Sequence, residues 1–219
     1  MTTPENPGAQ SYFDKVPKEW DALYSHEHGF MYRVNKALRK GLYERYAFTF
    51  EKCGDLTGAS VLDIGCGTAR YSIECAKRGA RRVTGIDFAP SMIEFSRNIA
   101  RQMGVAGQCT FIQGDVLAHE FTETFDVVLA LGLFDYIKDP APLFNKAASL
   151  KPRVFVASFP RFTFPWSIQR RIRYYLIKKC PIYDYSKEQI EGLCKAAGFD
   201  WFEVVKNSHG YLCAAGVKK

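Results

Sequence analysis

Two glycines and three aspartates are residue types suited to binding a nucleotide-like ligand. An apolar segment that contains Asp63 runs into a turn with Gly65 and Gly67. Glycine allows positive φ and lets a ligand approach the backbone closely, so we expect a ligand at this turn. Asp87 and Asp115 each follow a further apolar segment. Because ligands of open α/β sheets bind beyond the carboxyl ends of the strands, the three acids should converge there.

The spacing of the glycines separates two classes of cofactor. A dinucleotide-binding turn follows the pattern G-x-G-x-x-G, and Arg70 stands where its third glycine would fall. The pattern present, acid-x-Gly-x-Gly-x-small with Ala69 as the small residue, resembles the first motif of the class I S-adenosylmethionine-dependent methyltransferases. The resemblance implies that the cofactor is S-adenosyl-L-methionine.

The resemblance also implies a role for each cofactor-binding residue. Asp87 would accept hydrogen bonds from both ribose hydroxyls, and Asp115 would accept one from the adenine amino group. Asp63 and the backbone of Gly65 would receive the ammonium of the methionine arm, and we expect Arg33 to pair with its carboxylate. Burial in the core is the alternative role for one member of the set, Met92. The expected cofactor contacts are Arg33, Asp63, Gly65, Gly67, Asp87, Phe88, Met92, Asp115, Val116 and Leu131.

The elements that must position these residues alternate between strand and helix. Apolar runs predict strands at residues 61–64, 81–87, 109–113, 125–131, 153–158, 201–206 and 211–217. Helical spacing and end signals predict helices at residues 30–53, 71–78, 90–103, 139–150 and 186–198. Such alternation implies right-handed crossovers and a parallel sheet. The resemblance implies an α/β protein with the three-layer, Rossmann-like class I methyltransferase fold, whose mostly parallel seven-stranded sheet ends in an antiparallel hairpin.

We expect a single methyltransferase domain over residues 1–219, with an N-terminal helical cap at residues 1–56 and the core at residues 57–219. Residues 159–185 interrupt the alternation and are predicted to form a lid over the acceptor. Helical spacing from Trp166 to Ile177 would bury one face of this lid on the fifth strand, and a solvated basic face is the alternative. Its cations are Arg161, Arg170, Arg171, Arg173, Lys178 and Lys179.

Composition and charge argue against several classes of protein. Seven cysteines without a C-x-x-C pair argue against a disulfide framework or zinc ribbon and favour a reducing compartment. His26 and His28 stand two residues apart without a third ligand, so no metal site is expected. No signal peptide or membrane-spanning run is visible, so we expect a soluble, cytoplasmic protein. The net charge of +7 favours anionic partners without indicating nucleic acid.

The segment around the fourth predicted strand narrows the choice of methyl acceptor. Residues 125–128 and 133–140 are similar to small-molecule methyltransferases of quinone biosynthesis and, more loosely, to magnesium-protoporphyrin O-methyltransferases. In the second group a histidine often stands beside the tyrosine that matches Tyr136, and this chain has Asp135 there. Asp135 and Tyr136 are the candidate catalytic residues, since either would take the proton of a hydroxyl acceptor, whereas a carboxylate acceptor needs no base. The alternative roles are a surface carboxylate for Asp135 and a packed aromatic ring for Tyr136.

The sequence leaves three functions open. The first is transfer of a methyl group to oxygen of a small-molecule acceptor, an aromatic or acidic metabolite, with an anionic acceptor as one of the options. The others are an RNA or protein methyltransferase and a non-catalytic cofactor-binding protein. Enzymes that methylate nucleobase amines carry Asn/Asp-Pro-Pro-aromatic after this strand, whereas residues 130–133 read Ala-Leu-Gly-Leu. A single basic cluster weighs against RNA, and three intact acids weigh against lost catalysis.

Overall fold

The computed structural model describes residues 40–162, 168, 172 and 181–218. The described strands are β1 (Ser60–Ile64), β2 (Arg82–Asp87), β3 (Cys109–Gln113), β4 (Val127–Ala130), β5 (Val154–Pro160), β6 (Trp201–Lys206) and β7 (Gly210–Gly216). The described helices are α4 (Lys40–Cys53), α5 (Arg70–Lys77), α6 (Pro90–Gln102), α7 (Ala141–Ser149) and α9 (Lys187–Ala197), with a short 3-10 helix η1 (Phe134–Tyr136).

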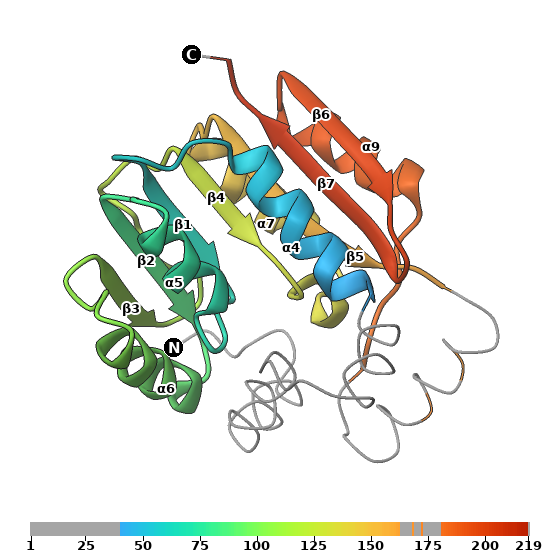
Figure 1. The fold of residues 1–219 in the computed structure, drawn as a ribbon. Helices are drawn as coiled ribbons and strands as arrows, with labels where there is room; N and C mark the ends of the chain where they lie inside the picture. The colour runs from blue at the N-terminus through green and yellow to red at the C-terminus, as the bar shows by residue number, and fades with distance from the viewer. Residues whose placement is uncertain (1–39, 163–167, 169–171, 173–180, 219) are drawn as a thin grey trace.

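All seven of the described strands belong to one sheet, in the order β3-β2-β1-β4-β5-β7-β6 (Figure 1). The first five strands pair in parallel, and β7 runs antiparallel to both β5 and β6. This sheet confirms the predicted fold class, including its C-terminal hairpin. The strand order reverses between β1 and β4, which is where open parallel sheets form a ligand crevice.

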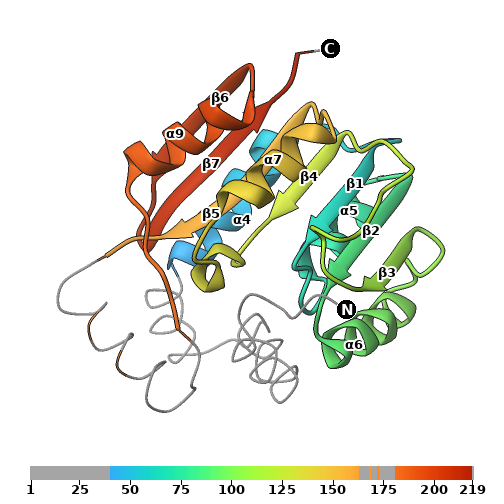
Figure 2. The ribbon, with the colours of Figure 1, turned by 180° about the vertical axis from the view of Figure 1, so that it is seen from behind.

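Helices cover both faces of the sheet, because its central strands are apolar on both sides. One buried cluster joins α4, α5 and α6 to the sheet through Phe48, Ile73 and Ile93. A second cluster joins α7 and α9 to the opposite face through Phe144 and Ile190, and these two helices lie in front of the sheet in Figure 2. The result is a three-layer structure in which the carboxyl ends of the parallel strands β1 to β5 share one edge.

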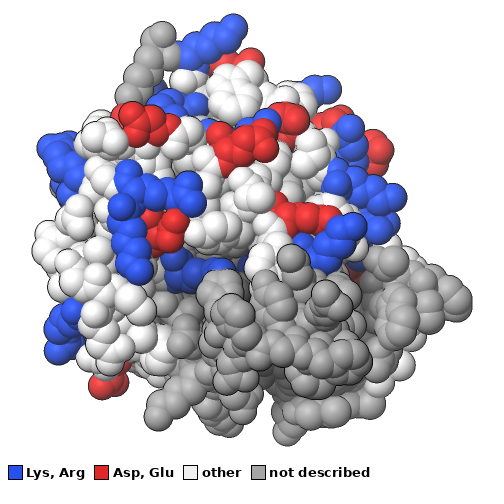
Figure 3. Space-filling model, viewed as in Figure 1, with Lys and Arg blue, Asp and Glu red and all other residues white. Residues whose placement is uncertain are grey.

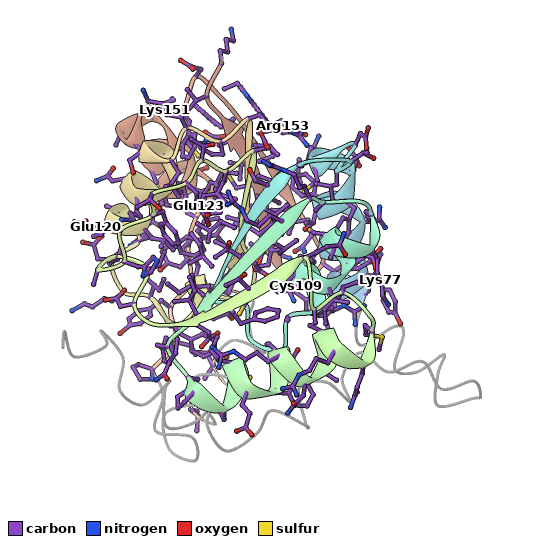
Figure 4. The ribbon with its side chains drawn as sticks, turned by 90° about the vertical axis from the view of Figure 1, so that its left-hand side faces the viewer. Lys77, Cys109, Glu120, Glu123, Lys151 and Arg153 are labelled. Atoms are coloured by element: carbon purple, nitrogen blue, oxygen red, sulfur yellow. The ribbon has the colours of Figure 1, made fainter. Side chains whose placement is uncertain are left out.

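The connection from β3 to β4 crosses the α7 face of the sheet without a described helix. Glu123 from this connection is paired to Arg82 at 2.6 Å and accepts a hydrogen bond from the Thr84 hydroxyl at 3.1 Å. Figure 4 shows Glu120 and Glu123 on this side of the sheet and Lys77 on the α5 side. A groove of about 260 Å³ runs between the connection and strands β2 and β3. It reaches the beginning of β2 rather than its carboxyl end, so it is separate from the predicted cofactor site.

Two helix starts differ from the prediction. Helix α7 was expected to start at residue 139, whereas Pro140 is the N-cap and Ala141 the first residue. Asp139 instead closes a turn, accepting a hydrogen bond from the Ala141 N–H at 3.1 Å. Helix α5 starts one residue early, at Arg70, because Ala69 adopts a left-handed conformation with φ of 60° and ends the glycine turn. The predicted helix over residues 30–53 is described from residue 40 onward, as α4.

The C-terminal hairpin packs against the start of α4. The backbone N–H and the hydroxyl of Ser208 both donate to the Glu44 carboxylate, at 2.7 and 2.8 Å. The ring of His209 lies on Gly41, where a Cβ would stand 1.8 Å from Nδ1. Gly41 costs helix propensity, and the structure shows that close packing with the hairpin requires it. Helix α4 is therefore fixed at the end nearest the carboxyl edge (Figure 1).

We expect Ser186→Ala to destabilise the protein by about 1 kcal/mol. Ser186 caps α9, accepting from the Gln189 N–H at 3.2 Å, while the Gln189 side chain accepts from the Ser186 N–H at 2.8 Å. Urea denaturation measures the loss. Ser149→Ala is the control, because the exposed Ser149 hydroxyl only donates to the Lys146 carbonyl at the end of α7. Equal stability of Ser186→Ala and the parent would contradict the role of this cap.

Candidate functional site

The glycine turn after β1 is left-handed at alternate residues. Gly65, Gly67 and Ala69 have φ values of 66°, 53° and 60°. A Cβ on Gly65 would stand 3.0 Å from Cδ1 of Leu133, whereas a Cβ on Gly67 would meet no atom of the described residues within 4 Å. Gly67 therefore leaves space above the turn, as a ligand lying against the backbone requires.

Asp87, at the carboxyl end of β2, holds this turn in place. Its Oδ2 accepts a hydrogen bond from the Gly67 N–H and its Oδ1 accepts one from the Ala89 N–H, both at 2.9 Å. Ser96 completes the arrangement by donating to the Gly67 carbonyl at 2.7 Å. A carboxylate oxygen has more than one acceptor site, so Asp87 retains the capacity to accept from ribose hydroxyls.

Asp63 lies deeper, beneath the start of α5. It is 3% exposed, and its Oδ2 accepts a hydrogen bond from the Ser72 hydroxyl at 2.6 Å. Burial raises the pKa of Asp63 to about 7, against the lowering effect of Ser72, and the negative charge of Asp87 raises it further. A cation near Asp63 would favour its ionised form, so the predicted role of receiving an ammonium is chemically consistent and stays a prediction.

Asp115 follows β3 at the same edge as Asp63 and Asp87. Its Oδ1 accepts from the Leu117 N–H at 2.9 Å, and the neighbouring Gly114 N–H donates to the Asp87 carbonyl at 2.9 Å. The three predicted acids and the glycine turn are therefore brought together along the carboxyl edge of β3, β2 and β1.

The remaining predicted cofactor residues differ in exposure. Phe88 and Val116 are half-buried beside the acids, and Leu131 is 8% exposed at the end of β4. Met92 is 2% exposed, as a core residue would be, and a cofactor contact by it stays a prediction. Arg33 lies outside the described residues, as do His26 and His28.

The candidate catalytic residues stand in η1, directly beyond β4. Asp135 is half-buried and Tyr136 is 7% exposed. The Tyr183 N–H donates to the Asp135 carbonyl at 2.9 Å, and the Tyr185 hydroxyl donates to the carbonyl of Ile137. The C-terminal end of the predicted lid is thus hydrogen-bonded to η1 and to the residue that follows it.

An aromatic cluster packs against η1. Phe134 stacks on Phe159 of β5 with ring centroids 4.3 Å apart, and Tyr185 meets Phe159 edge-on at 5.5 Å. These contacts place η1 at the junction of the β4 and β5 carboxyl ends.

The predicted lid lies largely outside the described residues, including Arg170, Arg171, Arg173, Lys178 and Lys179. Arg161, which is described, is half-buried directly after β5. Two described isoleucines of the segment, Ile168 and Ile172, are 43% and 54% exposed, whereas Ile182 near its end is buried. Closure over an acceptor stays a prediction.

Sequence reasoning missed several supporting residues. Three buried serines hold the site: Ser72 donates to Asp63, Ser96 to the Gly67 carbonyl, and Ser158 accepts from the Gly132 N–H at 2.8 Å. The sequence signal that could have identified these serines is a single small polar residue on an otherwise apolar helix face or strand. Arg45 was also missed, although it reaches the tip of β4 from α4.

Within the described residues, no group of three or more metal-ligating side chains occurs and no helix is long and apolar enough to span a membrane.

Residues 55–181, which include the glycine turn and η1, match a family described as a methyltransferase domain. The chain belongs to this methyltransferase family. Its cofactor is S-adenosylmethionine, and the space above Gly67, beside the Asp87 carboxylate, fits a nucleoside against the backbone.

Relatives of this methyltransferase cover different parts of it. A ubiquinone biosynthesis O-methyltransferase of Photorhabdus laumondii is 26% identical over 187 residues, which are 82% of this chain and 73% of the relative. The corresponding protein of Aeromonas salmonicida is 34% identical over 114 residues, 51% of this chain and 48% of the relative. The chain thus spans about half the length of that second protein.

The fold of this methyltransferase also occurs in a solved structure of magnesium protoporphyrin IX methyltransferase from Synechocystis with bound S-adenosylhomocysteine. The TM-score is 0.73, the identity is 20%, and the alignment covers 96% of this chain and 98% of the other. At this identity the likeness establishes the shared fold alone.

Proposed function

We propose that this methyltransferase transfers the methyl group of S-adenosylmethionine to an oxygen atom of an aromatic or acidic small molecule. The observation that carries the proposal is the position of η1, which sets Asp135 and Tyr136 at the β4 carboxyl end, beside the glycine turn. The relatives described above are named ubiquinone biosynthesis O-methyltransferases. This name supports an oxygen atom of a small molecule as the methyl acceptor.

The protein contributes little to the covalent chemistry, because the bound sulfonium supplies an activated methyl group. The residues of the chain orient the acceptor in line, exclude water and, for a phenol, remove a proton. Asp135 is the better candidate base, because its side chain is more accessible than that of Tyr136. A carboxylate acceptor needs no base at all.

We expect Asp135→Asn to reduce kcat for a phenolic acceptor by about 10²- to 10⁴-fold and to leave turnover of a carboxylate acceptor nearly unchanged. The measurement is S-adenosylhomocysteine release, with mass spectrometry of the product, over a panel of phenols, catechols and aromatic acids. Asp139→Asn is the matched control, because exposed Asp139 closes a turn four residues further on.

A panel without any methylated product, combined with methylation of RNA or protein, would contradict the small-molecule proposal. On the face in Figure 3, described basic side chains are interspersed with acidic ones, which favours a small acceptor over a nucleic acid. Cofactor binding without turnover of any acceptor would instead support the non-catalytic alternative.

A further inference from the structure

The candidate base Asp135 stands in η1, a helix of a single turn. The Tyr136 N–H donates to the Leu133 carbonyl at 3.0 Å, which closes the turn. The Ile137 N–H donates to the Phe134 carbonyl at 3.4 Å, a longer bond. A helix of this length does not form stably by itself in water. The orientation of Asp135 therefore depends on contacts that come from outside η1.

The C-terminal end of the predicted lid supplies such contacts on both sides of Tyr136. The Tyr183 N–H donates to the Asp135 carbonyl at 2.9 Å. The Tyr185 hydroxyl donates to the carbonyl of Ile137, the residue that follows η1. Carbonyls at the end of a helix lack partners within it, and a buried carbonyl without a hydrogen bond costs free energy. Tyr183 and Tyr185 thus hold η1 through carbonyls that its own turn does not use.

Tyr185 is itself fixed to the end of β5. Its N–H donates at 3.0 Å to the carbonyl of Pro160, the last residue of that strand. Tyr185 is 8% exposed, and its ring meets the rings of Phe159 and Phe134 edge-on, with centroids 5.5 and 6.4 Å away. Edge-to-face packing of this kind restricts the tilt of a ring. The hydroxyl therefore reaches Ile137 from a ring whose position is determined by the sheet.

The two tyrosines differ in what they require of the sequence. Tyr183 contacts η1 through a backbone N–H, which every residue except proline provides. Tyr185 contacts it through the side-chain hydroxyl, so phenylalanine would keep the ring packing and lose the hydrogen bond. Tyrosine at position 185 is therefore the part of this arrangement that a single substitution can test.

We propose that Tyr185 is a positioning residue for methyl transfer, which holds η1 on the end of β5 and so orients the Asp135 carboxylate toward the proton of the acceptor. The inference rests on the proposed function, in which Asp135 is the base for a phenol. Because Tyr185 acts through Asp135, its hydroxyl matters for acceptors that must lose a proton and not for carboxylates, which need no base.

The test removes the Tyr185 hydroxyl and keeps the ring. Tyr185→Phe should lower kcat for the fastest phenol or catechol of the panel about tenfold, because small displacements of a catalytic group are costly. Turnover of an aromatic acid and affinity for S-adenosylhomocysteine should stay within about twofold of the parent. In an Asp135→Asn background the same substitution should change kcat less than about twofold, because the group that it positions is already absent.

The control for a general loss of stability is Ser186→Ala. This variant removes the cap of α9 at the next residue of the chain, and it should retain the kcat of the parent for phenols. Equal losses for phenols and aromatic acids in Tyr185→Phe would assign Tyr185 a structural role and overturn the proposal. An effect of Asp135→Asn without any effect of Tyr185→Phe would also overturn it, and would leave the proposed function intact.

Hydrogen exchange of the cofactor-free protein, followed by mass spectrometry, tests the same contact without an acceptor. A peptide that contains the Tyr136 and Ile137 N–H groups should exchange about tenfold faster in Tyr185→Phe, and peptides of β1 should exchange as in the parent. Unchanged exchange in η1 would overturn the positioning role even if no methyl acceptor is found. Failure of the proposed function and failure of this inference are therefore read from different measurements.

Discussion

Replacing Asp87 with alanine is expected to weaken binding of S-adenosylhomocysteine tenfold to a hundredfold. A hydrogen bond to a charged acceptor contributes about 1.5–3 kcal/mol, which corresponds to that loss. Asp87 also holds the Gly67 and Ala89 N–H groups, each at 2.9 Å, so the variant loosens the turn that faces the ligand. Isothermal titration calorimetry measures the change.

The control for Asp87→Ala is Asp55→Ala. Asp55 likewise accepts a backbone N–H, that of Thr57, at 2.9 Å, but in an exposed turn before β1 and away from the carboxyl edge. Its loss should leave cofactor affinity unchanged. If Asp87→Ala lowers the melting temperature yet binds S-adenosylhomocysteine like the parent, Asp87 serves the turn alone and does not bind the ribose.

The second large effect is a pH dependence of stability that comes from Asp63. Burial raises its pKa from 3.8 to about 7, so the folded protein retains a proton there that the unfolded chain releases. The stability attributable to this proton is fully present below pH 3.8 and is lost as pH rises to about 7, by up to about 4 kcal/mol. Urea denaturation of the cofactor-free protein between pH 5 and pH 8 measures the loss.

Other groups titrate as well, so the informative quantity is the difference between the parent and Asp63→Asn. Asparagine keeps the shape and an oxygen that can accept from Ser72, but it has no carboxyl proton to lose. The groups that act on Asp63 include Asp87 of β2, and the nearby Cys66 and Cys75 thiols stay neutral because burial raises their pKa. A difference that does not vary with pH would contradict the assignment.

If the ammonium of the cofactor pairs with Asp63, binding favours the ionised carboxylate. S-adenosylhomocysteine should then bind more tightly as pH rises toward 7 and release a proton below that pH, whereas Asp63→Asn should bind it with little pH dependence. Calorimetry in two buffers with different ionisation enthalpies counts the protons. Equal apparent enthalpies in both buffers would show that Asp63 does not change its ionisation on binding.

The sequence by itself determined the elements and the acids at their ends. Strands such as β4 (Val127–Ala130) are short apolar runs whose pattern is local, and the alternation with helices leaves a parallel sheet as the simple solution. Because parallel strands end at one edge, Asp63, Asp87 and Asp115 had to meet there once the strands were recognised. The glycine turn was equally readable, since positive φ at Gly65 and Gly67 is a local property.

Only the tertiary structure decided which other side chains complete the site. Arg45 meets Tyr71 across 26 residues of sequence, and Gly41 is explained by a hairpin that folds back from the other end of the chain. Asp63 could be read as an acid at a turn, but its burial and its raised pKa depend on how α5 covers it. Contacts of this kind leave no local periodicity, because they arise from the packing of separate elements, whereas strands, turns and helix caps are specified by neighbouring residues.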